Sequence, residues 1–173
     1  MRRDPLLARL QVAEKEFLHF ALVFSRFEYA LKSSLVFARG NENSVEANWD
    51  MFAKVLDKYF NPKRHEVLRK SVEYLCAHPP MKQVLLNSEL RFEPFRSREN
   101  EPTLVRICDA IRVVRNNLFH GGKFETGPVI EPARDRDLLA ASCTILEECI
   151  ELSGVVEDER LAGVHKVFVC GLD

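Results

Sequence analysis

The chain has 173 residues, 46% of them hydrophobic, so it is long enough to form one domain with a proper core. Its formal net charge is −1, which excludes a protein that attracts nucleic acid through overall positive charge. Any contact with RNA must therefore come from a local basic patch.

Cysteine and histidine usage indicates a reduced, cytoplasmic protein without a metal. The five cysteines are an odd set with no Cys-x-x-Cys pair. The N-terminus lacks the layout of a signal peptide, and the most apolar run, Phe17 to Phe37, contains charges that would be costly in lipid. We expect no membrane association. No cofactor is expected, because the sequence has no glycine-rich nucleotide loop. No metal is expected either, because four histidines lack partners at metal-ligand spacing: His19, His65, His78 and His165.

The first predicted element is a long helix over residues 6–38, where apolar residues recur at helical spacing before Gly40. Its middle is apolar on more than one face. A helix of this kind must be covered on several sides. We therefore expect it to be central to the fold or to lie in a subunit interface.

Two further helices are predicted from their end signals. Asn43 with Glu46 three residues later resembles a capping box and predicts a helix through about Tyr59. Asn61-Pro62 places a capping side chain before a proline and predicts the start of the next helix. His78-Pro79-Pro80 ends that helix, because proline cannot donate to a continuing ladder.

The second half of the chain is dominated by two strong apolar stripes. After a short predicted helix over 81–87, the charged segment 91–102 contains two prolines and is expected to be an exposed loop. The stripes predict one helix from about Thr103 to Gly121-Gly122 and another over about 135–153. The tail after Val155 alternates like a short strand but could also pack as an apolar arm.

About five helices with short connections predict an all-α, up-and-down bundle with a long N-terminal helix. We expect it to form one domain over residues 1–173, with 155–173 as a C-terminal arm.

The chemistry is concentrated in the stretch Arg115-Asn116-Asn117-Leu118-Phe119-His120-Gly121-Gly122-Lys123. On a continuous helix Arg115 and His120 would not share a face, whereas Asn116 and His120 would. If Gly121-Gly122 unwind the last turn, His120 could turn toward Arg115 in one chain. Alternatively, a two-fold axis near this stretch would bring two arginines and two histidines into one cleft, and helix geometry favours this second arrangement. The alternative is a helix C-terminus whose cations complement the helix dipole.

That set of side chains suits cleavage of RNA without a metal. Imidazole has a reference pKa of about 6.5, so one His120 can accept the proton of a ribose 2′-hydroxyl while another protonates the departing 5′-oxygen. Arg115 offers a planar fork for the charged phosphate, and Asn116 can hold the imidazole or a phosphate. Lys123 and Asn117 are expected to bind substrate.

Arg-Asn followed by three residues and His, at the end of an apolar helix in a helical protein, resembles the HEPN superfamily. The run Phe27-Glu28-Tyr29-Ala30-Leu31-Lys32 is similar to stand-alone HEPN proteins of plasmids and mobile islands. The resemblance implies a homodimeric, metal-independent endoribonuclease, often a toxin or defence factor with an antitoxin partner. It implies that Arg115 and His120 are catalytic, that Asn116 supports them, and that Glu28 approaches the site.

The sequence leaves three points open. Some HEPN domains are inactive, so the chain could be a non-catalytic dimerisation module of a toxin–antitoxin or nucleotidyltransferase-linked system. Glu28 could equally be half of an ordinary surface pair with Lys32, four residues further on. The cations Arg91, Arg96 and Arg98 could either extend an RNA-binding rim or belong to a solvated loop.

Overall fold

The computed structural model describes residues 13–119 and 132–170, and 62% of these residues are helical. The described part contains six helices and two small antiparallel hairpins, so the protein is mostly helical and the expectation of a purely all-α chain is wrong. The elements in chain order are α2 (Glu14–Lys32), β1 (Ala38–Asn41), β2 (Ser44–Ala47), α3 (Trp49–Leu56), α4 (Glu66–Ala77), β3 (Met81–Leu86), β4 (Glu89–Pro94), α5 (Thr103–Phe119), α6 (Pro132–Val155) and α7 (Glu159–Val169).

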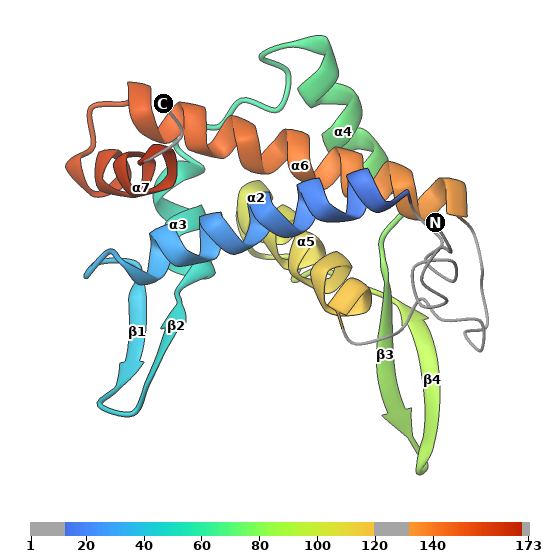
Figure 1. The fold of residues 1–173 in the computed structure, drawn as a ribbon. Helices are drawn as coiled ribbons and strands as arrows, with labels where there is room; N and C mark the ends of the chain where they lie inside the picture. Colours follow the sequence, from blue (N-terminus) through green and yellow to red (C-terminus); the bar gives the residue numbers. More distant parts are fainter. Residues whose placement is uncertain (1–12, 120–131, 171–173) are drawn as a thin grey trace, which may run out of the picture.

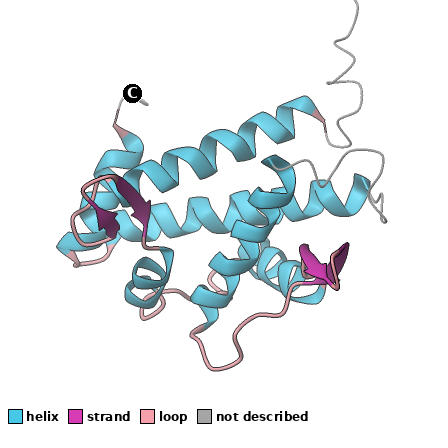
Figure 2. Ribbon diagram, turned by 90° about the horizontal axis from the view of Figure 1, so that it is seen from below, coloured by secondary structure: helices cyan, strands magenta, loops and turns pink. Residues whose placement is uncertain are grey.

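The long helix α6 organises the packing. It contacts α2, α4, α5 and α7, while α3 packs on α5. Figure 1 shows α2 and α6 lying side by side, with both hairpins projecting from the same side of the helical body. Figure 2, seen from below, shows that the two hairpins stand at separate places on that side.

Aromatic rings form the centre of the core between α2 and α3. Phe27 is fully buried and stacks on Trp49, with ring centroids 5.0 Å apart. Phe52 meets Phe27 edge-on at 5.2 Å. Such pairs add specific geometry to the burial of large apolar surfaces, which fixes how the two helices lie against each other. The expectation that the first helix is central to the fold is thus confirmed.

The C-terminal segment forms the helix α7, rather than the strand that its alternating pattern suggests. Leu161 and Val164 are fully buried against the core. The guanidinium of Arg26 on α2 donates to the backbone carbonyls of Phe168 and Cys170, at the end of α7. Cationic side chains satisfy the last carbonyls of helices in this way.

The β1–β2 hairpin replaces the first turns of the predicted second helix. Oδ1 of Asn41 accepts a hydrogen bond from the backbone N–H of Asn43, which reverses the chain. Ser44–Ala47 then pairs with Ala38–Asn41 as a strand. The helix starts only at Trp49, where Oδ1 of Asn48 accepts from the N–H of Met51 at 3.1 Å.

The β3–β4 hairpin occupies the segment expected to be a short helix followed by a loop. Asn87 and Ser88 have φ values of +51° and +64°, as a two-residue turn joining antiparallel strands requires. Met81–Leu86 therefore pairs with Glu89–Pro94, and only the residues after Pro94 remain a loop before α5. The prediction of a helix over 81–87 is wrong.

The other predicted boundaries agree in part. α5 and α6 confirm the two strong apolar stripes, and α4 ends before His78-Pro79-Pro80 as expected. However, α4 starts at Glu66 with His65 as its cap, because Asn61 instead accepts from the N–H of Lys63 in a turn. α2 ends at Lys32, earlier than expected.

Candidate functional site

A cleft of about 250 Å³ lies between α2, the β1–β2 hairpin and α5. α5 contributes Arg112, Arg115 and Asn116, whose spacing of three and four residues puts them on one face of the helix. Glu28 lines the cleft from α2. The structure thus brings together Arg115, Asn116 and Glu28, three of the candidate residues.

The guanidinium of Arg115 is held over two aromatic rings. Its central carbon is 5.6 Å from the ring centroid of Phe24 and 5.6 Å from that of Phe119. Nη1 donates to Oδ1 of Asn116 at 3.0 Å, and Nη2 lies 3.9 Å from Oε2 of Glu28. The side chain remains 33% exposed, so this cation is oriented by its neighbours and still reachable from the cleft.

Glu28 stands between two cations. Its carboxylate is 3.9 Å from Arg115 and 3.7 Å from Nζ of Lys32. Glu28 therefore forms the ordinary surface pair with Lys32 and also approaches Arg115. A carboxylate in this place limits how much positive charge the cleft presents.

The cleft nevertheless has a surplus of positive charge. Its four cations are Lys32, Arg39, Arg112 and Arg115, against the two carboxylates of Glu28 and Glu46, which leaves a net charge of +2. Its lining also includes Phe24 and Trp49, each only 3% exposed. A local cationic cleft of this kind attracts anions even though the whole chain has a net charge of −1.

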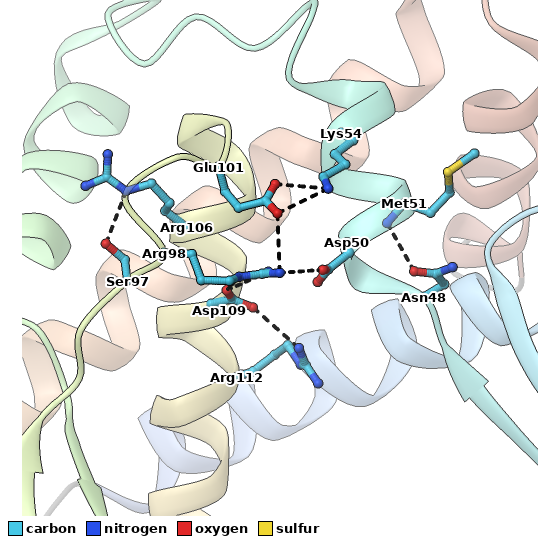
Figure 3. Close-up of polar contacts among 10 residues, drawn as sticks. All are labelled: Asn48, Asp50, Met51, Lys54, Ser97, Arg98, Glu101, Arg106, Asp109 and Arg112. Carbon is cyan, nitrogen blue, oxygen red and sulfur yellow. Dashed lines mark hydrogen bonds and ion pairs between the residues drawn. The ribbon is translucent and has the colours of Figure 1, made fainter.

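Arg112 is tied into a network of ion pairs that lies beside the cleft (Figure 3). Its Nη1 is 3.5 Å from Oδ1 of Asp109, whose Oδ2 accepts two hydrogen bonds from Arg98 at 2.8 and 3.0 Å. Arg98 also donates to Asp50 at 2.8 Å, and this hydrogen bond lowers the pKa of the Asp50 carboxyl below its usual value. The network joins α3, the segment before α5 and α5 itself.

Among the remaining candidates of the motif, the structure describes Asn117, which lies away from the cleft. Nδ2 of Asn117 donates to the backbone carbonyl of Met81 at 2.6 Å, so this amide ties α5 to β3. Asn117 does not line the cleft. His120, Gly121-Gly122 and Lys123 lie outside the described residues.

The three loop arginines have three different environments. Arg98 is engaged in the network of Figure 3. Arg91 lies on β4 and pairs with Glu89 at 2.7 Å. Arg96 makes no ion pair or hydrogen bond with any described residue, and it lines a different pocket on α5. The structure therefore does not gather them into one rim.

Arg112, Arg39 and Trp49 were missed from the sequence. Arg112 could have been found, because it precedes Arg115 by three residues and must share its helix face. Arg39 carries no such signal, since it reaches the cleft only through the β1–β2 hairpin. Trp49 looked like one more apolar position of a helix.

No family model, curated protein or solved structure matches this chain. Within residues 13–119 and 132–170, no three His, Cys, Asp or Glu side chains are grouped so that they could hold a metal ion. No helix in that part of the chain is both long and apolar enough to cross a membrane.

Proposed function

We propose that the protein is a metal-independent endoribonuclease of the HEPN type, with a HEPN-like helical bundle that works as a homodimer. The observation that carries this proposal is the cationic cleft in which Arg115, Asn116 and Glu28 meet. Guanidinium groups bind phosphate oxygens in a planar, forked geometry. The Arg115–His120 spacing supplies the class of reaction, through its resemblance to the HEPN motif.

In the proposed reaction, one His120 accepts the proton of a ribose 2′-hydroxyl, and the 2′-oxygen attacks the adjacent phosphorus. The bond from phosphorus to the 5′-oxygen breaks, and a second imidazole protonates the departing oxygen. The products are a 2′,3′-cyclic phosphate and a 5′-hydroxyl end. Arg115 stabilises the charge that builds up on the pentacovalent phosphate, and Asn116 keeps its guanidinium in place.

The other residues have supporting roles in this proposal. Arg112 supplies a second guanidinium for the phosphates next to the scissile one. Glu28 holds Arg115 and restrains the charge of the cleft, and Lys123 follows the motif as a further phosphate contact. Asn117 acts indirectly, by fixing β3 to α5.

An exposed apolar stripe on α2 supports the homodimer. Leu18, Leu22 and Tyr29 are 53%, 59% and 64% exposed, and their spacing puts them on one face of the helix. The stripe starts one residue from Phe17, which contacts Phe119 at the end of α5. Two copies joined here would supply the two imidazoles that the reaction uses.

A second candidate function, a non-catalytic interaction module, is favoured by a different observation. The β3–β4 hairpin exposes Leu85, Leu86 and Leu90, at 71%, 40% and 62%. A projecting hairpin with exposed leucines suits contact with another protein, such as an antitoxin or a linked nucleotidyltransferase. Under this alternative, the same dimer would form but RNA would not be cut. A toxin or defence role in the cytoplasm belongs to the enzyme proposal.

The deciding experiment is to incubate the purified protein with a broad panel of RNAs in EDTA and to analyse the ends of the products. Wild type should yield 2′,3′-cyclic phosphate, and Arg115→Ala and His120→Ala should each lose the activity. Arg91→Ala is the matched control, because Arg91 is an exposed arginine away from the cleft. The enzyme proposal would be wrong if cleavage persisted in both variants. It would also be wrong if the wild type cleaved none of the RNAs.

A further inference from the structure

A second pocket, of about 380 Å³, lies between the C-terminal end of α4, the segment after β4 and the first half of α5. It shares no lining residue with the cleft around Arg115. Leu75 and Ile107, each 2% exposed, and Ala110, 7% exposed, give it an apolar floor. Phe95 adds a half-buried aromatic wall.

The rim of this pocket carries two guanidinium groups that are largely unused. Nε of Arg106 donates to Oγ of Ser97 at 3.1 Å, but its terminal nitrogens have no acceptor among the described residues. Arg96 has no partner in that part of the chain either. The carboxylate of Glu99 stands at the same rim, so the three charged side chains sum to +1.

We propose that this pocket binds a small organic anion that carries one carboxylate on an apolar, ring-sized body. The volume lies in the range of small-molecule sites, which typically combine an apolar lining with a few converging polar groups. An inorganic anion has no apolar surface that the floor of the pocket could bury, whereas an amphipathic anion would bury its apolar body there. The forked donors of Arg96 and Arg106 match a carboxylate, and the net charge of +1 matches its single charge.

This inference is independent of the proposed nuclease activity, since it uses neither Arg115 nor any other residue of the cleft. It assigns a use to the one loop arginine, Arg96, that neither the ion-pair network nor β4 employs. The pocket also contains its own reporter. Cys76 lines it with an exposed thiol, and Cys170 is an exposed thiol elsewhere.

The test is the rate at which a maleimide alkylates Cys76 in the whole protein, with Cys170 as the internal control. Increasing 2-naphthoate should slow alkylation of Cys76 to a plateau and leave Cys170 unchanged. The neutral isostere 2-naphthamide and inorganic phosphate should each need at least about tenfold higher concentration for the same protection, because each lacks half of the recognition.

Variants connect the protection to the rim. Arg96→Gln and Arg106→Gln should each weaken naphthoate protection by about tenfold, since a charge-assisted hydrogen bond is lost. Arg91→Gln, an exposed arginine outside the pocket, should leave it unchanged. Equal protection by naphthamide, equal protection of Cys170, or full protection in both rim variants would overturn the proposal. The Arg115→Ala variant, which is expected to lose RNA cleavage, should show the same protection of Cys76 by naphthoate as the wild type.

Discussion

Arg112 brings a second guanidinium to the cleft beside Arg115. Its side chain is 40% exposed, and its one ion pair within residues 13–119 and 132–170, with Asp109, is long at 3.5 Å. Replacing Arg112 with Gln should therefore leave stability within about 0.5 kcal/mol. If it contacts a phosphate, RNA affinity should fall several-fold and the slope of log K against log salt should shrink by about 0.7, as measured by fluorescence anisotropy across a salt series.

Arg160→Gln is the matched control for this substitution. Arg160 has a similar exposure of 41%, pairs with Asp158, and lies on α7 outside the cleft. Its loss should change neither the affinity nor the salt slope. Identical behaviour of the two variants would remove Arg112 from the binding site.

At the scale of residues, the local spacing of side chains was the useful signal. Arg115 and Asn116 were predicted from the Arg-Asn-x3-His spacing at the end of one strong apolar helix, and the structure places both in the cleft. Asn117 has the same chemistry, but a rotation of about 100° per residue directs it to Met81 on β3 instead. Arg39 reaches the cleft through tertiary packing of the β1–β2 hairpin, which spacing along the chain does not encode.

The β1–β2 hairpin depends on Gly40. Its φ is +150°, and a Cβ built there would lie 2.1 Å from the carbonyl oxygen of Ser44. Gly40→Ala should lower the free energy of unfolding by about 1–3 kcal/mol, because the backbone of the hairpin must deform where Gly40 on β1 meets β2. RNA binding should weaken as well, since Arg39 and Glu46 line the cleft from this hairpin. Urea denaturation and anisotropy measure the two effects.

Gly163→Ala on α7 should have the opposite effect on stability. A Cβ at Gly163 meets nothing within 4 Å, and alanine is the better helix former by roughly 0.5–1 kcal/mol. A loss of stability from Gly163→Ala, or none from Gly40→Ala, would contradict this account of the two glycines.

The network around Arg98 joins three elements and should make stability depend on pH. The pKa of Asp50 is lowered in the folded protein, mainly by its hydrogen bond from Arg98, so its contribution is present at neutral pH. This contribution is lost as the pH falls from the usual pKa of a carboxyl group through the lowered pKa of Asp50. Asp50→Asn should therefore reduce the free energy of unfolding by about 0.5–1 kcal/mol at pH 7, since solvent screens a carboxylate that is 35% exposed. The difference from wild type should shrink below about pH 4.

Glu42→Gln is the control for the pH series. Glu42 is an exposed carboxylate in the β1–β2 turn, without a charged partner among the described residues. Its substitution should shift stability by less than about 0.5 kcal/mol at either pH. A difference for Asp50→Asn that stays constant from pH 7 to pH 3 would show that the ion pair is not its cause.

At the scale of elements, length decided what could be predicted. α5 and α6 repeat their apolar positions over 17 and 24 residues, and both were predicted. β1 and β2 have four residues each, too few to establish an alternation against the capping signals of Asn43 and Glu46. In Met81–Leu86 the run Val84-Leu85-Leu86 masks any alternation, so the paired strand was not distinguishable from a short helix.

At the scale of the whole molecule, the exposed stripe of α2 is the surface on which the proposed homodimer depends. Leu22→Glu should disrupt association, because it would bury a charge at the centre of an apolar contact. We expect the mass from light scattering to fall to that of a monomer and RNA cleavage to be lost, while the circular dichroism spectrum stays unchanged.

Val67→Glu is the matched control, since Val67 is similarly exposed, at 61%, but lies on α4. This variant should retain both the dimer and the activity. Should Leu22→Glu remain dimeric, the interface would have to be elsewhere. Should the wild type itself be monomeric, the shared-site mechanism would fail.

The position of α6 after α2 and α4 in the chain affects how the protein folds during synthesis. α6 is the element against which α2, α4 and α7 all pack, yet it begins only at Pro132. During synthesis the apolar faces of α2 and α4 therefore stay exposed until α6 has been made. Contacts between residues this far apart in the sequence form slowly, and apolar surface stays exposed until they form. A chain whose synthesis stops before α6 should therefore need a chaperone to stay in solution, because the apolar faces of α2 and α4 would lack their partner.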